Sequence, residues 1–127
     1  MDVLHAALWV DDVEAMDEFY TEGLGLEFSR EFEGSDGVRN YFLTGESDTE
    51  IQFKHDEGVD RESGPSSGFD HVAIAVEDVE DRVDRLVDAF GSEVVRGPDL
   101  LADKGIEIAF VTDPEGYVVE LIERLEE

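Results

Sequence analysis

Hydrophobic and polar positions follow two periodicities along this chain, and the same succession of periods occurs twice. In the first half, apolar residues of period two, typical of half-buried strands, occupy residues 3–10, 26–30, 38–43 and 49–54. Between the first two of these strands, an apolar stripe from Val13 to about Glu22 has helical spacing. Asp11-Asp12 supplies its N-cap, and Gly23 and Gly25 end it. The first half is therefore predicted to be β-α-β-β-β.

The second half repeats this order after a stretch rich in Gly, Ser and charge. Strands are predicted at residues 70–76, 93–96, 106–111 and 117–122, and a helix from Val79 to Phe90 begins after Glu77-Asp78 and stops at Gly91. His71 follows His5 by 66 residues, and Glu120 follows Glu50 by 70. A duplicated unit accounts for the whole chain, as module 1 (1–55), a linker (56–68) and module 2 (69–127).

The last predicted strand carries an acidic residue in an apolar setting. Asp113-Pro114-Glu115-Gly116 has the composition of a tight turn, and the apolar strand that follows has Glu120 at its centre. A half-buried carboxylate requires compensation, because removing water from it costs several kcal/mol or more. A bound cation would compensate it, and Arg124 is the nearby basic alternative.

Each half contributes one histidine at the start of its first strand and one glutamate within its last strand. Small alanines share the predicted face of each histidine and leave room above the sheet. Two imidazoles and two carboxylates, from His5, Glu50, His71 and Glu120, would suit zinc, nickel, cobalt or iron better than calcium. His55 has no counterpart in the second half and is expected at the surface.

Composition limits the class of protein. The chain has 127 residues, of which 41% are hydrophobic, and is long enough for one compact domain or two half-sized modules. It contains no cysteine, which excludes disulfides, thiolate metal sites and a cysteine nucleophile. It also lacks an apolar run of membrane-spanning length and the features of a signal peptide. We expect a soluble, cytoplasmic protein.

The charge balance is strongly acidic. Thirty-five Asp and Glu residues face nine Lys and Arg residues, for a formal net charge of −26. This charge argues against nucleic acid or an anionic membrane surface as a partner. The acids are interleaved with a regular apolar pattern, so they are interpreted as the solvated faces of folded elements, as in the cytosolic proteins of salt-accumulating halophiles.

Several motifs together resemble those of one superfamily over nearly the whole length. The matching segments are Leu4-His5, Phe19-Tyr20, Gly23-Leu24-Gly25-Leu26, Glu50-Ile51, Asp70-His71-Val72-Ala73, Gly97-Pro98, Ile108–Tyr117 and Glu120-Leu121-Ile122-Glu123. They resemble the vicinal-oxygen-chelate superfamily (glyoxalase, bleomycin resistance protein and dioxygenase), and most of all the short bacterial-type glyoxalase I enzymes, or lactoylglutathione lyases.

The resemblance implies an α+β fold in which two tandem βαβββ modules form a curved mixed sheet around a metal site, commonly in a homodimer. His5, Glu50, His71 and Glu120 would hold one divalent ion, with nickel or cobalt favoured and zinc also compatible. The enzyme would convert the hemithioacetal of methylglyoxal and a small thiol into a 2-hydroxyacyl thioester. Glu120 would be the general base, with Glu50 as the alternative for a substrate of the other hand.

The chain departs from the family at positions that contact the thiol. Trp9 stands where the family has a glutathione-binding arginine, and Lys54 stands where an asparagine was expected. Trp9, Lys54 and Lys104 are the candidate substrate-binding residues, and a γ-glutamyl thiol smaller than glutathione would suit these changes. The alternatives are another metalloenzyme on the same scaffold, an epimerase or an extradiol dioxygenase, or a non-enzymatic protein that sequesters a drug or metabolite.

The acidic composition predicts that salt stabilises the fold. At molar salt the Debye length falls to about 3 Å, so repulsion between neighbouring carboxylates is screened. The midpoint of thermal unfolding, followed by circular dichroism, is expected to rise steadily from dilute buffer to molar KCl. A protein that stays cooperatively folded in dilute buffer without divalent metal would contradict this interpretation.

Overall fold

Each half of the chain folds as a β-α-β-β-β unit, as predicted, in a computed structural model that describes residues 3–57 and 71–125. The two units comprise residues 1–64 and 65–127. Most of the expected linker, residues 58–68, and Asp70 at the start of an expected strand lie outside the described residues. No helix in the described ranges is long and apolar enough to cross a membrane.

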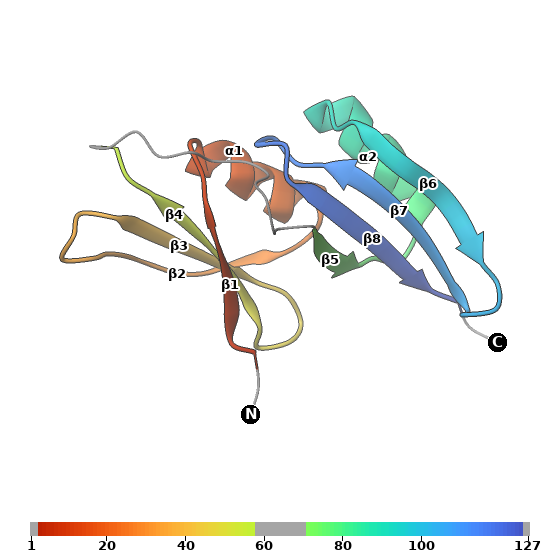
Figure 1. Cartoon of the computed structure of the whole chain (residues 1–127), viewed down its shortest axis with the longest axis horizontal. Helices are drawn as coiled ribbons and strands as arrows, with labels where there is room; N and C mark the ends of the chain where they lie inside the picture. Colours follow the sequence, from red (N-terminus) through yellow and green to blue (C-terminus); the bar gives the residue numbers. More distant parts are fainter. Residues whose placement is uncertain (1–2, 58–70, 126–127) are drawn as a thin grey trace. The chain divides into compact units, whose positions relative to one another are not determined.

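Unit 1 consists of a four-stranded sheet and one helical segment. Its elements are β1 (His5–Trp9), α1 (Val13–Glu18), the π-helical turn η1 (Phe19–Gly23), β2 (Glu27–Glu33), β3 (Arg39–Thr44) and β4 (Glu50–His55). The strand order is β1-β4-β3-β2, in which β1 runs parallel to β4 and the other neighbours are antiparallel (Figure 1). The first and last strands of the unit are therefore neighbours.

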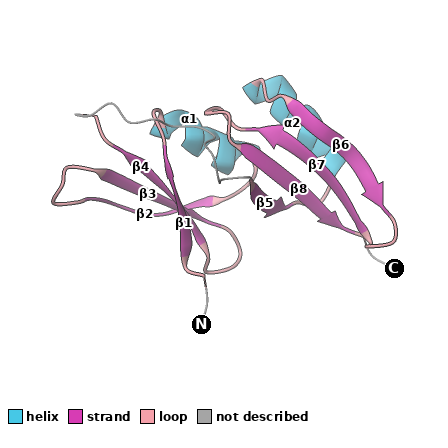
Figure 2. Cartoon of the chain, in the orientation of Figure 1, coloured by secondary structure: helices cyan, strands magenta, loops and turns pink. Residues whose placement is uncertain are grey.

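Unit 2 repeats this topology. Its elements are β5 (Val72–Ala75), α2 (Val79–Phe90), β6 (Val94–Leu101), β7 (Ile106–Thr112) and β8 (Val118–Arg124). The order β5-β8-β7-β6 again pairs the first and last strands in parallel. Each unit thus has one helical segment with a four-stranded sheet; Figure 2 draws the helices in cyan and the strands in magenta.

Local capping explains where the helices begin and end. The side chain of Asp12 accepts a hydrogen bond from the backbone N–H of Ala15, and Asp78 does the same for Asp81. Helix α2 ends at Gly91, whose φ of 69° lies in the left-handed region that glycine adopts without strain. These are the caps that the sequence predicts.

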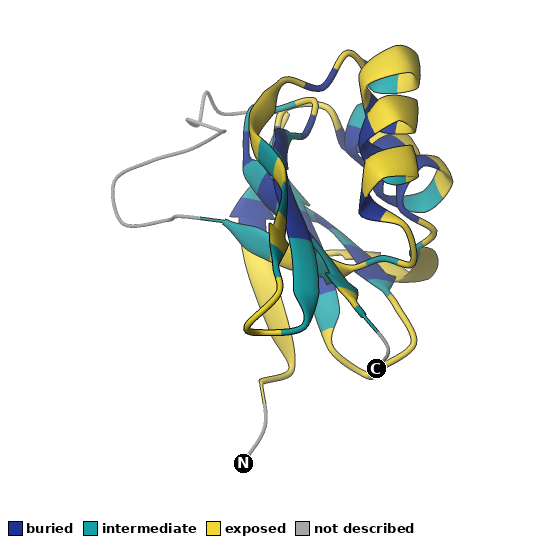
Figure 3. Ribbon diagram, turned by 90° about the vertical axis from the view of Figure 1, so that its right-hand side faces the viewer, coloured by how far each residue is buried: buried dark blue, intermediate teal, exposed yellow. Residues whose placement is uncertain are grey.

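Each sheet has one face covered by its own helical segment. In unit 1 the ring of Tyr20 lies 5.5 Å from that of Phe53, and both side chains are fully buried. In unit 2, Val119 and Leu121 are fully buried, and α2 contacts their strand. Alternate residues of the strands point to the opposite face, which we call the helix-distal face. Figure 3 colours the strands and helices by how far each residue is buried.

Strands β2 and β6 extend three or more residues past their predicted ends. Strand β2 continues to Glu33, and β6 continues through Gly97-Pro98 to Leu101, five residues past the end predicted at residue 96. Both are edge strands with register irregularities against their single neighbour. An edge strand accommodates a proline because its missing N–H can face away from the ladder.

The turn before β8 provides a test of the fold. Asp113 is buried, and its Oδ1 accepts hydrogen bonds from the backbone N–H groups of Glu115 and Tyr117, at 2.9 and 3.0 Å. Asp113→Ala removes the acceptor of both donors and should lower the free energy of unfolding by about 1–3 kcal/mol, measured by thermal or urea unfolding in high salt. The exposed helical Asp84 is the matched control, since Asp84→Ala removes the same charge. Equal losses in the two variants would contradict the assigned role of Asp113.

Candidate metal centre

A histidine and a carboxylate meet on the helix-distal face of unit 2. His71 lies just before β5, and its Nε2 is 3.0 Å from Oε1 of Glu120 in β8. The two side chains keep 31% and 16% of their exposure, so both are reachable but partly desolvated. His71 is thus a partner of Glu120, whose chain neighbours Val119 and Leu121 are buried on the opposite face of the strand.

Aromatic and basic side chains surround this pair. Phe110 lies directly opposite Glu120 in the β7–β8 register, and the His71 ring stands on it edge to face, with centroids 5.4 Å apart at 86°. Arg96, opposite Phe110 on β6, holds its guanidinium carbon 5.9 Å from the Phe110 ring centroid. The His71–Glu120 pair thus lies beside the Phe110 ring, and the guanidinium of Arg96 lies near the same ring.

Unit 1 contains the same arrangement. The His5 ring stands edge to face on Phe42 at 5.9 Å and 86°, and Arg30, opposite Phe42 on β2, places its guanidinium carbon 3.9 Å from the Phe42 ring centroid. Phe42 lies directly opposite Gln52 of β4. His5, Phe42 and Arg30 are therefore the counterparts of His71, Phe110 and Arg96.

The register corrects the alignment of the two glutamates. Glu50 lies directly opposite His5, whereas Gln52 lies opposite Ala7 and Phe42. In unit 2 it is Glu120 that lies opposite Ala73 and Phe110. The structural counterpart of Glu120 is therefore Gln52, and the expected equivalence of Glu50 and Glu120 is wrong by two residues along β4.

Glu50 is held by its neighbours on β2. Ser29 Oγ donates to Glu50 Oε2 at 2.5 Å, and Arg30 Nη2 donates to Oε1 at 3.2 Å. The hydrogen bonds from Arg30 and then Ser29 lower the pKa of Glu50 from its usual range, because they favour the ionised form. Glu50 keeps 15% of its side-chain exposure, and its donors come from the same unit.

Gln52 is not among the site residues predicted from the sequence. It is 7% exposed, and its Nε2 donates to Oδ1 of Asn40 at 2.8 Å. Asn40 is 4% exposed, and its Nδ2 donates to the backbone carbonyl of Val38 at 3.0 Å. Gln52 and Asn40 are thus linked by hydrogen bonds on the helix-distal face, which the alternation of apolar and polar residues does not reveal.

The predicted substrate contacts lie in different places. Trp9 and Lys54 are direct neighbours across β1 and β4, with the Lys54 ammonium 5.4 Å from the Trp9 ring centroid. They share the helix-distal face of Gln52. Lys104 is exposed in the turn between β6 and β7, beyond Ile106, which itself lies four strand positions or roughly 13 Å from Phe110. Its role as a substrate contact stays a prediction.

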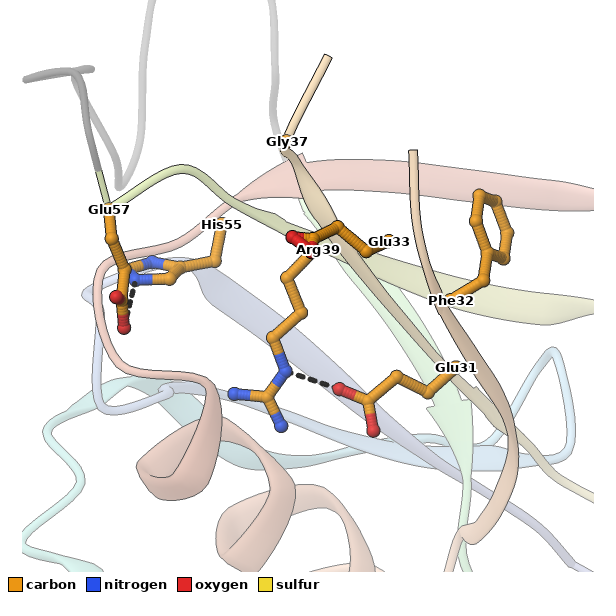
Figure 4. Close-up of a pocket in the computed structure, with 7 residues that line it drawn as sticks. All are labelled: Glu31, Phe32, Glu33, Gly37, Arg39, His55 and Glu57. Carbon is orange, nitrogen blue, oxygen red and sulfur yellow. Dashed lines mark hydrogen bonds and ion pairs between the residues drawn. The ribbon is translucent and has the colours of Figure 1, made fainter. Parts of the chain in front are cut away.

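A pocket of about 450 Å³ opens elsewhere in unit 1. It is lined by Glu31, Phe32, Glu33, Gly37, Arg39, His55 and Glu57 (Figure 4). Arg39 is paired there with Glu31, and His55 is half-buried, with Nδ1 3.0 Å from the carbonyl of Val10, rather than at the surface as expected. None of the candidate metal ligands lines this pocket.

The donor atoms fit a divalent transition metal by their chemistry. Within residues 3–57 and 71–125, no group of three or more His, Asp or Glu side chains is close enough to hold an ion. The candidate donors are divided between the units: His5 and the polar residues of β4 belong to unit 1, and His71 and Glu120 belong to unit 2. Imidazole nitrogen with carboxylate or amide oxygen is a borderline set that zinc, cobalt and nickel accept.

Comparison with known proteins gives consistent matches over nearly the full length. A profile of the Glyoxalase/Bleomycin resistance protein/Dioxygenase superfamily matches residues 2–121. A probable lactoylglutathione lyase of Synechocystis sp. is 34% identical over 97% of this chain and 95% of its own, and a lactoylglutathione lyase of Haemophilus influenzae is 35% identical over 97% and 93%.

Solved structures agree with the sequence relatives. Glyoxalase I from Zea mays superposes with a TM-score of 0.81 at 30% identity, over 98% of this chain, which spans only 45% of the maize chain. The trypanothione-dependent glyoxalase I of Leishmania major gives a TM-score of 0.80 at 26% identity over 97% and 86%. By its fold, its motifs and these matches, the chain belongs to the Glyoxalase/Bleomycin resistance protein/Dioxygenase superfamily.

Proposed function

We propose that this protein is a metal-dependent lyase of the glyoxalase I type. It converts the hemithioacetal of methylglyoxal and a low-molecular-weight thiol into a 2-hydroxyacyl thioester. The observation that carries the proposal is the contact between His71 and Glu120, a partly desolvated imidazole–carboxylate pair on the helix-distal face of unit 2. The names of the Synechocystis and Haemophilus relatives support the same reaction.

His5, His71 and Glu120 are the proposed ligands, together with a fourth donor from β4. Each unit supplies one set of donors, and the proposal is the same whether the sets that share an ion belong to one chain or to two. Held by these residues, a divalent ion would supply Lewis-acid polarisation of the substrate oxygens, which would acidify the neighbouring carbon-bound proton.

Glu120 is the proposed general base. Its carboxylate takes the proton from the carbon that bears sulfur and returns it to the adjacent carbon, while the hydroxyl proton moves to the former ketone oxygen. The reaction is thus an isomerisation that needs no oxidant. Glu50 is the weaker candidate, because Ser29 and Arg30 stabilise its ionised form and occupy both of its oxygens.

Trp9 and Lys54 are the proposed contacts for the thiol part of the substrate. The Lys54 ammonium stands over the Trp9 ring on the same face as the β4 donor, and it can pair with a carboxylate of a γ-glutamyl thiol. We propose an anionic thiol smaller than glutathione as the natural cosubstrate.

Reconstitution tests the function directly. The protein, stripped of metal by a chelator in molar KCl, is loaded separately with nickel, cobalt and zinc and given methylglyoxal with glutathione or γ-glutamylcysteine. Thioester formation, followed by its ultraviolet absorbance, is expected with nickel or cobalt and absent without metal. No thioester with any metal and thiol would favour the epimerase or the binding protein instead.

Glu120→Gln tests the base. The neutral amide cannot accept the proton, so kcat should fall by about 10²- to 10⁴-fold, with an unchanged circular dichroism spectrum. Glu77→Gln, at an exposed position before α2, is the matched control and should keep full activity. If Glu120→Gln turns over at the normal rate, the base must be assigned to another residue.

A further inference from the structure

We propose that the side-chain carbonyl of Gln52 is the β4 donor to the metal, and that Asn40 is the positioning residue that turns this oxygen towards the ion. The inference rests on the proposed metal-dependent function and specifies a residue of that same site. It assigns to a neutral amide the place that the sequence suggested for the carboxylate of Glu50.

The first argument is position. In unit 1, Ala7 follows His5 by two residues and lies opposite Gln52 of β4. In unit 2, Ala73 follows His71 by two residues and lies opposite Glu120 of β8. In unit 2 this diagonal relation brings His71 to 3.0 Å from Glu120. In unit 1 the residue in the same register position relative to its histidine is Gln52, whereas Glu50 lies directly opposite His5.

The second argument is the shared surroundings. Gln52 lies opposite Phe42, and Glu120 lies opposite Phe110. Each of these phenylalanine rings has an edge-to-face contact with the histidine of its unit and lies near the guanidinium of an arginine. Since these neighbours recur at matching positions, the two polar side chains occupy the same place in the two units.

The third argument is orientation. The backbone carbonyl of Val38 can only accept, so the Asn40 group that faces it must be the amide nitrogen, and Oδ1 points to Gln52. Gln52 must then present its own nitrogen to Asn40. This chain of two hydrogen bonds leaves Oε1 of Gln52 directed away from Asn40.

The fourth argument is the state of that oxygen. Within the described residues no hydrogen bond reaches Oε1 of Gln52, and Ser92 Oγ is the one buried side-chain polar atom without a partner, so Oε1 keeps contact with solvent. Because Nε2 donates to Asn40, the carbonyl oxygen is the end of this amide that a cation can reach. Glu50 differs, because Ser29 and Arg30 already occupy its oxygens.

Nuclear magnetic resonance tests the ligand without relying on activity. The chain has a single glutamine and a single asparagine, so the side-chain amide region holds only two NH₂ pairs. Adding the diamagnetic Zn²⁺ to the metal-free protein in high salt should shift the Gln52 amide and its Cδ strongly. Zn²⁺ that binds without moving these signals would overturn the inference.

Metal affinity tests the same residue by substitution. Gln52→Leu removes the donor and should weaken Co²⁺ binding, measured by calorimetry, by about 10- to 100-fold, with a changed visible spectrum of the bound Co²⁺. Gln52→Glu keeps an oxygen donor and adds charge, so it should bind Co²⁺ at least about tenfold more tightly. Glu50→Gln, two residues away on the same face, should change the affinity less than about threefold; a tenfold loss there would restore Glu50 as the ligand.

The role of Asn40 has a separate signature. Asn40→Leu should weaken Co²⁺ binding about tenfold in the native background, because Gln52 is then free to turn its nitrogen to the ion. In the Gln52→Glu background the same substitution should change the affinity less than about threefold, since a carboxylate presents an oxygen either way round. Equal losses in both backgrounds would show that Asn40 has only a structural role.

The outcomes separate this inference from the proposed function. If the native protein binds neither Zn²⁺ nor Co²⁺, the metal-dependent function fails, and the inference fails with it. If the native protein binds Co²⁺ and Gln52→Leu binds it equally well with the same spectrum, only the inference about Gln52 is overturned.

Discussion

The parallel pairing of the first and last strands of each unit is the constraint on which the rest of the site depends. A β-α-β-β-β chain that folds this way places the start of its first strand beside the start of its last one. The parallel ladder determines which side chains meet, and the helical segment covers one face only. Polar groups of the helix-distal face can therefore gather without disturbing the apolar core.

Most of the fold follows from local signals that a sequence displays. Asp12 and Asp78 cap the helices where predicted, Gly91 ends α2, and alternating apolar residues locate the strands. The ends of β2 and β6 were missed because an edge strand with one neighbour tolerates Gly97-Pro98, which elsewhere would end a strand.

The position of Gln52 could not be found from periodicity, for a geometric reason. Shifting a strand by two residues leaves every side chain on its original face. The hydrophobic pattern of β4 therefore matches that of β8 equally well whether Glu50 or Gln52 is aligned with Glu120. The resemblance of Glu50-Ile51 to Glu120-Leu121 then favoured the wrong choice. Phe42 and Phe110 are 68 residues apart, as are Gln52 and Glu120, and this common spacing was the signal that the sequence contained.

The relay of Asn40 and Gln52 also bears on the chemical durability of the protein. Side-chain amides hydrolyse slowly to acids, and this ageing reaction depends on access to water and on a backbone free to move. These two residues are the only amides that the chain can lose in this way, and both are more than nine-tenths buried within a paired sheet. In the folded chain both side-chain amides are therefore protected from hydrolysis, whereas an unfolded chain would expose both.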